Sequence, residues 1–215
     1  MSFDMHLHSI FSDGELLPSE IARRYAEKGF EAIAITDHAD GSNMEFILKH
    51  LLRAKGELQG HDIKVLIGIE LTHLPPDLIP RFAVKAKKLG AEVVVVHGET
   101  IVEPVARGTN SAGVSTPDVD ILSHPGLITV EEAELAKENE IFLELSARKG
   151  HCLANGHVAR VAEEVKAELL VNTDSHAPED IILPENILNV ALASGLSDKY
   201  SRIITAVNPR RLTVD

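Results

Sequence analysis

The sequence predicts an α/β fold in which about seven strand–helix units close into a barrel. Apolar segments typical of strands alternate with amphipathic segments typical of helices along the chain. This alternation favours a parallel sheet covered by helices and connected by right-handed crossovers. At least six of the strand-like segments end at a histidine or an acidic residue. A closed ring of strands brings six such ends together, whereas an open sheet gathers ligands between two or three strands.

Seven strand-like segments are rich in valine, isoleucine and leucine, as expected for a parallel sheet that is buried on both faces. They cover residues 2–8, 32–37, 64–71, 92–97, 120–123, 141–146 and 168–173. The helix-like segments that alternate with them cover residues 18–29, 43–59, 76–89, 129–139, 154–166 and 184–195.

Several helix ends carry residues with known capping preferences. Pro18 opens the first helix and Gly29 closes it. Thr129 stands three residues before Glu132, which predicts a capping box. Gly90 stands where the helix at 76–89 should stop.

Residues 99–118 interrupt the alternation. They are rich in glycine, serine, asparagine and proline, and we interpret them as a loop insertion on the rim, with a short helical turn. The chain has 215 residues and no repeat or linker, so residues 1–215 are expected to form a single domain. The C-terminal residues 208–212 either cap the barrel or contact a neighbouring molecule, and the oligomeric state is not predicted.

Composition limits the partners and the compartment. Lys and Arg total 21 and Asp and Glu total 33, giving a net charge of −12, which disfavours nucleic acid as a partner. No apolar run reaches the roughly 18 residues of a membrane helix, so no membrane partner is expected. No basic stretch followed by an apolar one precedes His6, so we expect no signal peptide, and a lone cysteine, Cys152, fits a reducing compartment. We therefore expect a cytoplasmic protein.

Histidines and carboxylates at the strand ends predict a multinuclear metal centre. His6 and His8 are two residues apart on one strand, and Asp174 and His176 repeat this spacing at the end of the last strand. Residues two apart on a strand point to the same face, so one strand can supply two ligands. Imidazole and carboxylate together suit Zn²⁺, Mn²⁺ or Fe²⁺ better than Mg²⁺ or Ca²⁺. The remaining candidate ligands are Asp13, His38, Glu70, His97 and His124.

The motifs that carry these residues are His6-Leu7-His8-Ser9, Thr36-Asp37-His38, Gly68-Ile69-Glu70, Val96-His97-Gly98, Ser123-His124-Pro125 and Thr173-Asp174-Ser175-His176. Over nearly the whole chain they resemble the PHP family, named for its polymerase and histidinol phosphatase members. The resemblance implies an irregular (β/α)7 TIM-like barrel that carries three divalent ions. It implies one ion on His6, His8, Glu70 and Asp174, a second on Asp13, His38 and His176, and a third on Glu70, His97 and His124.

Members of that family mostly hydrolyse phosphate esters, so the resemblance implies a metal-dependent phosphoesterase. The expected substrate is a small phosphorylated metabolite, such as histidinol phosphate, a nucleotide or a cyclic phosphate. Three divalent transition metal ions (Zn, Mn or Fe) are expected to hold the phosphate oxygens and to produce hydroxide from bound water. The sequence contains no glycine-rich phosphate loop and no Gly-x-Ser-x-Gly elbow.

Other residues are candidates for supporting roles. Arg148, just after the sixth strand, is suited to bidentate contacts with phosphate, and Arg107 in the rim loop is a second candidate. His151 is a candidate acid for the leaving group, and His73 is expected to line the cleft. Asp37 is expected to orient His38 or a neighbouring ligand through a hydrogen bond.

Three other functions stay open at this point. An amidohydrolase would share the His-x-His start but usually has a lysine at a strand end, and here the nearest candidate, Lys149, lies in a loop. A 3′-end nuclease would use the same metal centre. A non-catalytic RNA-binding barrel should have a basic face and should lack the metal ligands.

Overall fold

Seven parallel strands form the centre of the fold in this computed structural model, which describes residues 2–214. The order around the sheet is β1-β2-β4-β5-β6-β7-β8, so each strand lies beside its neighbour in sequence. Their bounds are β1 Phe3–Leu7, β2 Ala32–Ile35, β4 Lys64–Leu71, β5 Val93–His97, β6 Ile121–Ser123, β7 Phe142–Ser146 and β8 Leu169–Asn172. A two-residue strand, β3 (His38–Ala39), pairs with β4. The predicted barrel of seven units is confirmed.

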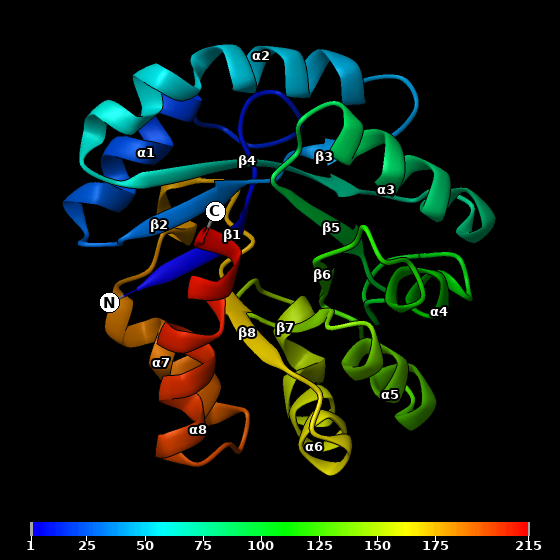
Figure 1. Cartoon of the computed structure of the whole chain (residues 1–215). Coiled ribbons are helices and arrows are strands. Elements are labelled where there is room, and N and C mark those ends of the chain that lie inside the picture. Colours follow the sequence, from blue (N-terminus) through cyan, green and yellow to red (C-terminus); the bar gives the residue numbers. More distant parts are fainter. Residues whose placement is uncertain (1, 215) are drawn as a thin grey trace.

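Helices surround the strands (Figure 1). They are α1 Pro18–Glu27, α2 Met44–Leu58, α3 Ile79–Lys88, α4 Thr109–Val114, α5 Val130–Glu138, α6 Asn155–Val165, α7 Pro184–Ala193 and α8 Asp198–Arg202. The six predicted helices are present with ends shifted by a few residues, and residues 76–78 form a 3-10 turn before α3. The capping box is confirmed, because Thr129 Oγ1 accepts from Glu132 N (3.1 Å) and Glu132 Oε2 accepts from Thr129 N (2.9 Å).

The barrel closes between β1 and β8 without a regular ladder. His8 N donates to Ser175 O at 3.0 Å, and the side-chain Oδ1 of Asn172 accepts from Met5 N at 2.9 Å. A side chain thus takes the place of a ladder hydrogen bond at this seam, which makes the barrel irregular. The seam brings the ends of the first and last strands together, and these are the strands that carry the paired candidate ligands.

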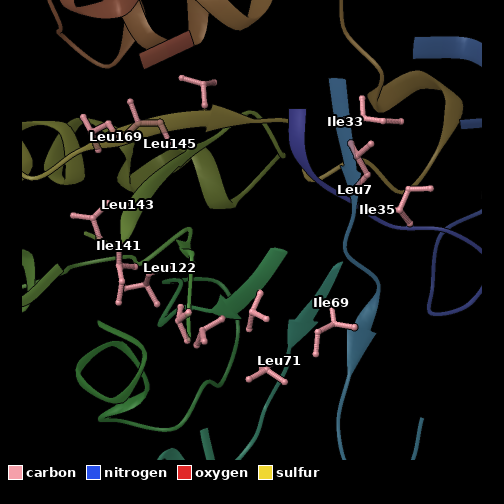
Figure 2. Packing of buried hydrophobic residues seen from close by; sticks show 14 of the residues in the cluster. Leu7, Ile33, Ile35, Ile69, Leu71, Leu122, Ile141, Leu143, Leu145 and Leu169 are labelled. Atoms are coloured by element: carbon pink, nitrogen blue, oxygen red, sulfur yellow. The ribbon is translucent and has the colours of Figure 1, made fainter. Parts of the chain in front are cut away.

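Two apolar clusters lie on the two faces of the sheet. The inner cluster, inside the barrel, contains Phe3, Met5, Ala32, Ala34, Leu66, Val93, Val95, Ile121, Phe142 and Leu170. The outer cluster lies between the strands and the helices and includes Leu7, Ile33, Ile35, Ile69, Leu122 and Leu143 (Figure 2). Because side chains alternate along a strand, each strand buries apolar groups on both faces.

The C-terminal segment closes the end of the barrel at which the strands begin. Leu212 packs against the inner cluster, and the guanidinium groups of Arg210 and Arg211 lie 5.8 Å and 5.1 Å from the ring centres of Phe3 and Phe142. Figure 1 shows this segment, in red, beside β1. The structure thus shows the capping contact expected for residues 208–212.

Residues 99–118 connect β5 to β6, and α4 is the helical part of this segment. Its start is anchored by Glu99, whose Oε1 accepts from Gly108 N (2.9 Å) and Asn110 N (3.0 Å). Within residues 2–214, no helix combines the length and the apolar character needed to cross a bilayer.

Candidate metal centre

Strand alternation carries the candidate ligands into the barrel. On β5, Val93 and Val95 belong to the inner cluster, and His97 follows them on the same face. On β4, Leu66 is inner, and Glu70 lies four residues further along the same face. The polar side chains at the carboxyl ends of the strands thus lie together inside the barrel, next to the inner cluster.

On β1 an irregularity was needed to turn both histidines inward. Phe3 and Met5 both lie in the inner cluster, so strict alternation would turn His6 toward the helices. The register between β1 and β2 shifts between Asp4 and Leu7, and Leu7 packs in the outer cluster. As in a β-bulge, this shift re-aims the strand, and His6 and His8 point into the barrel.

The nine predicted ligand residues lie together, within four overlapping sets. In each set, the candidate ligand atoms lie within 4.8 Å of one another. The sets are His8, Asp13, His38 and His176; His6, His8 and Glu70; His6, His124 and Asp174; and Glu70, His97 and His124. Because the sets share members, they form one continuous centre that could hold several ions. The grouping differs from the expectation in two ways: His8 also joins the set around Asp13, and Asp174 lies in a set with His6 and His124 instead of one with His8 and Glu70.

Glu70 is the central carboxylate. Its side chain is fully buried, with Oε1 3.2 Å from His6 Nε2 and Oε2 2.7 Å from His38 Nδ1. Ser123 Oγ donates a hydrogen bond to Oε1 at 2.7 Å. Burial alone would raise the pKa of Glu70, but the surrounding imidazoles, His6 foremost, hold this pKa well below its ordinary value. Glu70 is therefore an anion that faces several ligand nitrogens at once.

The donor set fits divalent transition metal ions. Nε2 of His6 and Nε2 of His8 are only 3.0 Å apart in a buried site. Within residues 2–214, the buried Nδ1 atoms of His8, His97 and His124 have no hydrogen-bond partner. Imidazole nitrogens that face one another, with carboxylates between them, are satisfied when cations lie among them.

Glu144 was not predicted, although it is a fully buried acid in the middle of β7. Its Oε2 lies 2.8 Å from His6 Nδ1 and accepts from Asn172 Nδ2 at 2.9 Å. A proton on Nδ1 of His6 leaves Nε2 free to act as a ligand, so Glu144 orients His6 and selects its tautomer. The charged residue within the apolar segment Phe142-Leu143-Glu144-Leu145 was the available signal.

Asp4 was also missed. It is buried, accepts from Tyr25 Oη (2.9 Å) and Thr173 Oγ1 (2.6 Å) through Oδ2, and accepts from Thr173 N (3.1 Å) through Oδ1. Burial raises the pKa of Asp4 to about 7. These bonds hold the chain just before Asp174, whose φ of 53° lies in the left-handed region. Such backbone conformations cost energy and often occur at functional sites.

The expectation for Asp37 was wrong. Its oxygens accept from Ser9 N, Ser9 Oγ and Ser12 Oγ, each at 2.7 Å. Asp37 therefore fixes the turn that leads to Asp13, and His38 is oriented instead by Thr72 Oγ1, 2.7 Å from its Nδ1. The strand ends two residues before Asp37, so strand geometry no longer directs its side chain.

A cavity of about 280 Å³ opens onto the centre. The predicted supporting residues Arg148, His151 and His73 line it, whereas Arg107 lies outside it on the rim. Arg148 Nη1 donates to Asp174 O at 3.1 Å, and its side chain is 30% exposed, so the guanidinium is held at the wall but accessible. His151 is buried, with Nδ1 2.7 Å from Thr100 Oγ1, and burial lowers its pKa.

Glu103 was the third functional candidate that the sequence did not reveal. It reaches the cavity from the rim segment, and its carboxylate lies 3.2 Å from His97 Nε2. The hydrogen bond with His97 lowers the pKa of Glu103 to about 2. Its place in a loop gave no periodicity from which to predict this position.

Together, the barrel and its donor set define a class of protein: a TIM-like barrel whose strand ends carry clusters of residues that could bind metal. The chain belongs to the PHP family, because the sequence profile of the PHP domain matches residues 4–166.

Similar sequences include probable phosphatases and a ribonuclease P protein component. An uncharacterized protein of Methanocaldococcus jannaschii is 53% identical over 201 residues, which are 93% of this chain and 92% of that protein. A probable phosphatase of a Thermoanaerobacter species is 27% identical over 91% of this chain and 87% of its own length. Ribonuclease P protein component 3 of Methanosarcina barkeri is 24% identical over 98% of this chain and 87% of its own length.

Solved structures show the same fold at low sequence identity. A chain in an archaeal ribonuclease P complex with mature tRNA superimposes with a TM-score of 0.71, at 18% identity, over 98% of this chain and 87% of that one. Histidinol phosphate phosphatase from Lactococcus lactis, complexed with zinc, L-histidinol and phosphate, gives a TM-score of 0.61 at 17% identity, over 91% of this chain and 94% of that one.

Proposed function

We propose that this protein is a metal-dependent phosphoesterase that hydrolyses a small phosphorylated metabolite at a trinuclear centre. The observation that carries the proposal is the buried Glu70 carboxylate among eight other candidate ligands, the nine coming from six strand ends and one loop. Family membership and the similarity to a probable phosphatase support the same reaction class.

We infer that the ions number three and are Zn²⁺, Mn²⁺ or Fe²⁺. Glu70 would bridge two of them, since it belongs to two sets. Bound ions would neutralise phosphate oxygens and supply an activated water as the nucleophile. The sets that would hold the ions are His6, His8, Glu70 and Asp174; Asp13, His38 and His176; and Glu70, His97 and His124.

The side chains at the cavity wall would bind the phosphate group and protonate the leaving group. Arg148 would donate hydrogen bonds to phosphate oxygens, because its guanidinium is accessible and fixed by Asp174 O. His151 would hold a proton at Nε2 for the leaving-group oxygen, with Nδ1 held by Thr100. The cavity of about 280 Å³ suits a small ester, since it lies at the small end of ligand pockets.

The proposal is tested with protein stripped by a chelator and then reloaded with Mn²⁺ or Zn²⁺. We expect the reloaded protein to hydrolyse esters in a panel of phosphorylated metabolites and the stripped protein to be inactive. Glu70→Gln is the matched inactive control. Reloaded protein that contains ions but releases phosphate from no ester would refute the proposal.

RNA binding is a second candidate, favoured by the similarity to ribonuclease P component 3 and to the archaeal complex. The net charge of −12 and the intact donor set weigh against it. Titration of tRNA and of single-stranded oligonucleotides at low salt separates the functions. Tight binding that weakens steeply with salt would favour RNA, and shortening of oligonucleotides from the 3′ end would favour a nuclease.

A further inference from the structure

Glu103 places an additional carboxylate beside the metal centre. Its Oε2 lies 3.2 Å from His97 Nε2 and 3.7 Å from His73 Nε2, and its Oε1 lies 3.4 Å from His151 Nε2. The candidate ligand atoms of His73, His97 and Glu103 lie within 4.8 Å of one another. His97 is also a member of the set with Glu70 and His124. Oε2 of Glu103 thus faces the candidate ligand His97, and Oε1 faces His151, whose imidazole can donate a hydrogen bond to it.

The segment that carries Glu103 is held by hydrogen bonds at Glu99 and Thr100 but is exposed around Glu103 itself. Glu99 accepts hydrogen bonds from the backbone at Gly108 and Asn110, and Thr100 contacts His151. By contrast, the side chain of Glu103 is 37% exposed, and Ile101 beside it is 50% exposed. The Glu103 carboxylate therefore reaches the centre but has solvent to move into.

We propose that Glu103 is a displaceable ligand for the ion held by Glu70, His97 and His124, and that phosphate takes its place. This inference rests on the proposed function. Three protein ligands leave one open position in a tetrahedral site, as in catalytic zinc sites, and a fourth ligand closes it. A carboxylate and a phosphate oxygen compete for the same cation and for the same imidazoles. Glu103 would then keep the ion bound between turnovers and leave when substrate enters.

The test uses metal-loaded full-length protein with Glu103→Gln, Glu103→Asp and the matched control Glu138→Gln, which removes an exposed carboxylate from α5. Ion content is measured after dialysis against graded chelator, and binding of inorganic phosphate is measured by calorimetry. We expect Glu103→Gln to lose one ion equivalent at a chelator concentration about ten-fold lower than the control, and to bind phosphate several-fold more tightly. Glu103→Asp keeps the charge but is shorter, so it should lose the same ion.

An identical chelator profile and phosphate affinity in Glu103→Gln and Glu138→Gln would overturn the inference. It would also be overturned if Glu103→Asp matched the unsubstituted protein while Glu103→Gln did not, because charge alone would then explain the effect. Ion binding and ester hydrolysis by the unsubstituted protein distinguish this outcome from failure of the proposed function. If it binds ions and hydrolyses esters, only the role of Glu103 is lost, whereas a protein that hydrolyses no ester refutes the function itself.

Discussion

Replacement of Glu144 by glutamine should weaken metal binding without unfolding the protein. In the structure, Oε2 of Glu144 faces His6 Nδ1 (2.8 Å) and Asn172 Nδ2 (2.9 Å), and Oε1 accepts from His124 N at 3.3 Å. An amide can supply only one accepting oxygen. In the variant, the NH2 group of the amide must therefore face either the backbone N–H of His124 or Nδ1 of His6. In the second case, the His6 proton would move to Nε2, the nitrogen that faces Glu70.

Either rearrangement disturbs a candidate ligand through its hydrogen-bond partner. Loss of such a partner typically reduces metal affinity about 10- to 100-fold, which corresponds to about 1.4 to 2.7 kcal/mol. Without bound ions, the Glu144 carboxylate repels the nearby Asp174 carboxylate, so an amide of the same shape relieves this repulsion and offsets the disturbed hydrogen bond. We therefore expect the urea midpoint of the metal-free Glu144→Gln variant to change little while its affinity for Zn²⁺ falls.

Chelator competition measures the affinity, and urea unfolding of the stripped protein measures the stability. Glu168→Gln, an acid 40% exposed and paired with Arg211, is the control. The reasoning about His6 would be refuted if Zn²⁺ affinity stayed within two-fold of the control, or if the metal-free variant lost stability by as much as it lost binding energy.

Three further predictions concern Glu70, the ions and Asp4. Because Glu70 belongs to two ligand sets, Glu70→Gln should lower ion content by more than one equivalent; elemental analysis showing full occupancy would contradict this. Because ions bind the folded state, loading at 100-fold above the dissociation constant should add about 2.7 kcal/mol of stability and raise Tm; an unchanged Tm in a thermal scan would count against the centre. The folded pKa of Asp4, about 7, exceeds the ordinary 3.8, so the folded state binds the extra proton and stability should fall as pH rises from about 4 to about 7. Relative to Asp4→Asn, metal-free protein should lose up to about 4 kcal/mol across that range; parallel urea midpoints at pH 4.5 and 8 would disprove it.

Local pattern was sufficient for the barrel and for most of the centre. Continuous runs of valine, isoleucine and leucine, ending in residues such as Glu70 and His97, depend only on neighbours along the chain. Helix boundaries such as Thr129 with Glu132 are equally local. For this reason the strands, the helices and all nine candidate ligands could be named from the sequence, with the residue assignments made by resemblance to a known family.

Contacts between distant segments decided the rest. Glu144 acquires its role only because closure of the barrel brings β7 near β1, with β8 between them. Asp4 acquires its role only because β1 meets the residues after β8. A one-residue irregularity in β1, invisible as a pattern, turns His6 inward. Asp37 turns toward Ser9 and Ser12 because its strand has already ended.

The sequence by itself determined which elements form and which side chains reach the carboxyl ends of the strands, because hydrophobic periodicity and strand polarity act over a few residues. Only the tertiary structure decided which ligands share an ion set, which buried acids orient them and that Glu103 faces His97. Those relations depend on closure of the barrel and on loop conformation, and neither leaves a periodic signal in the chain.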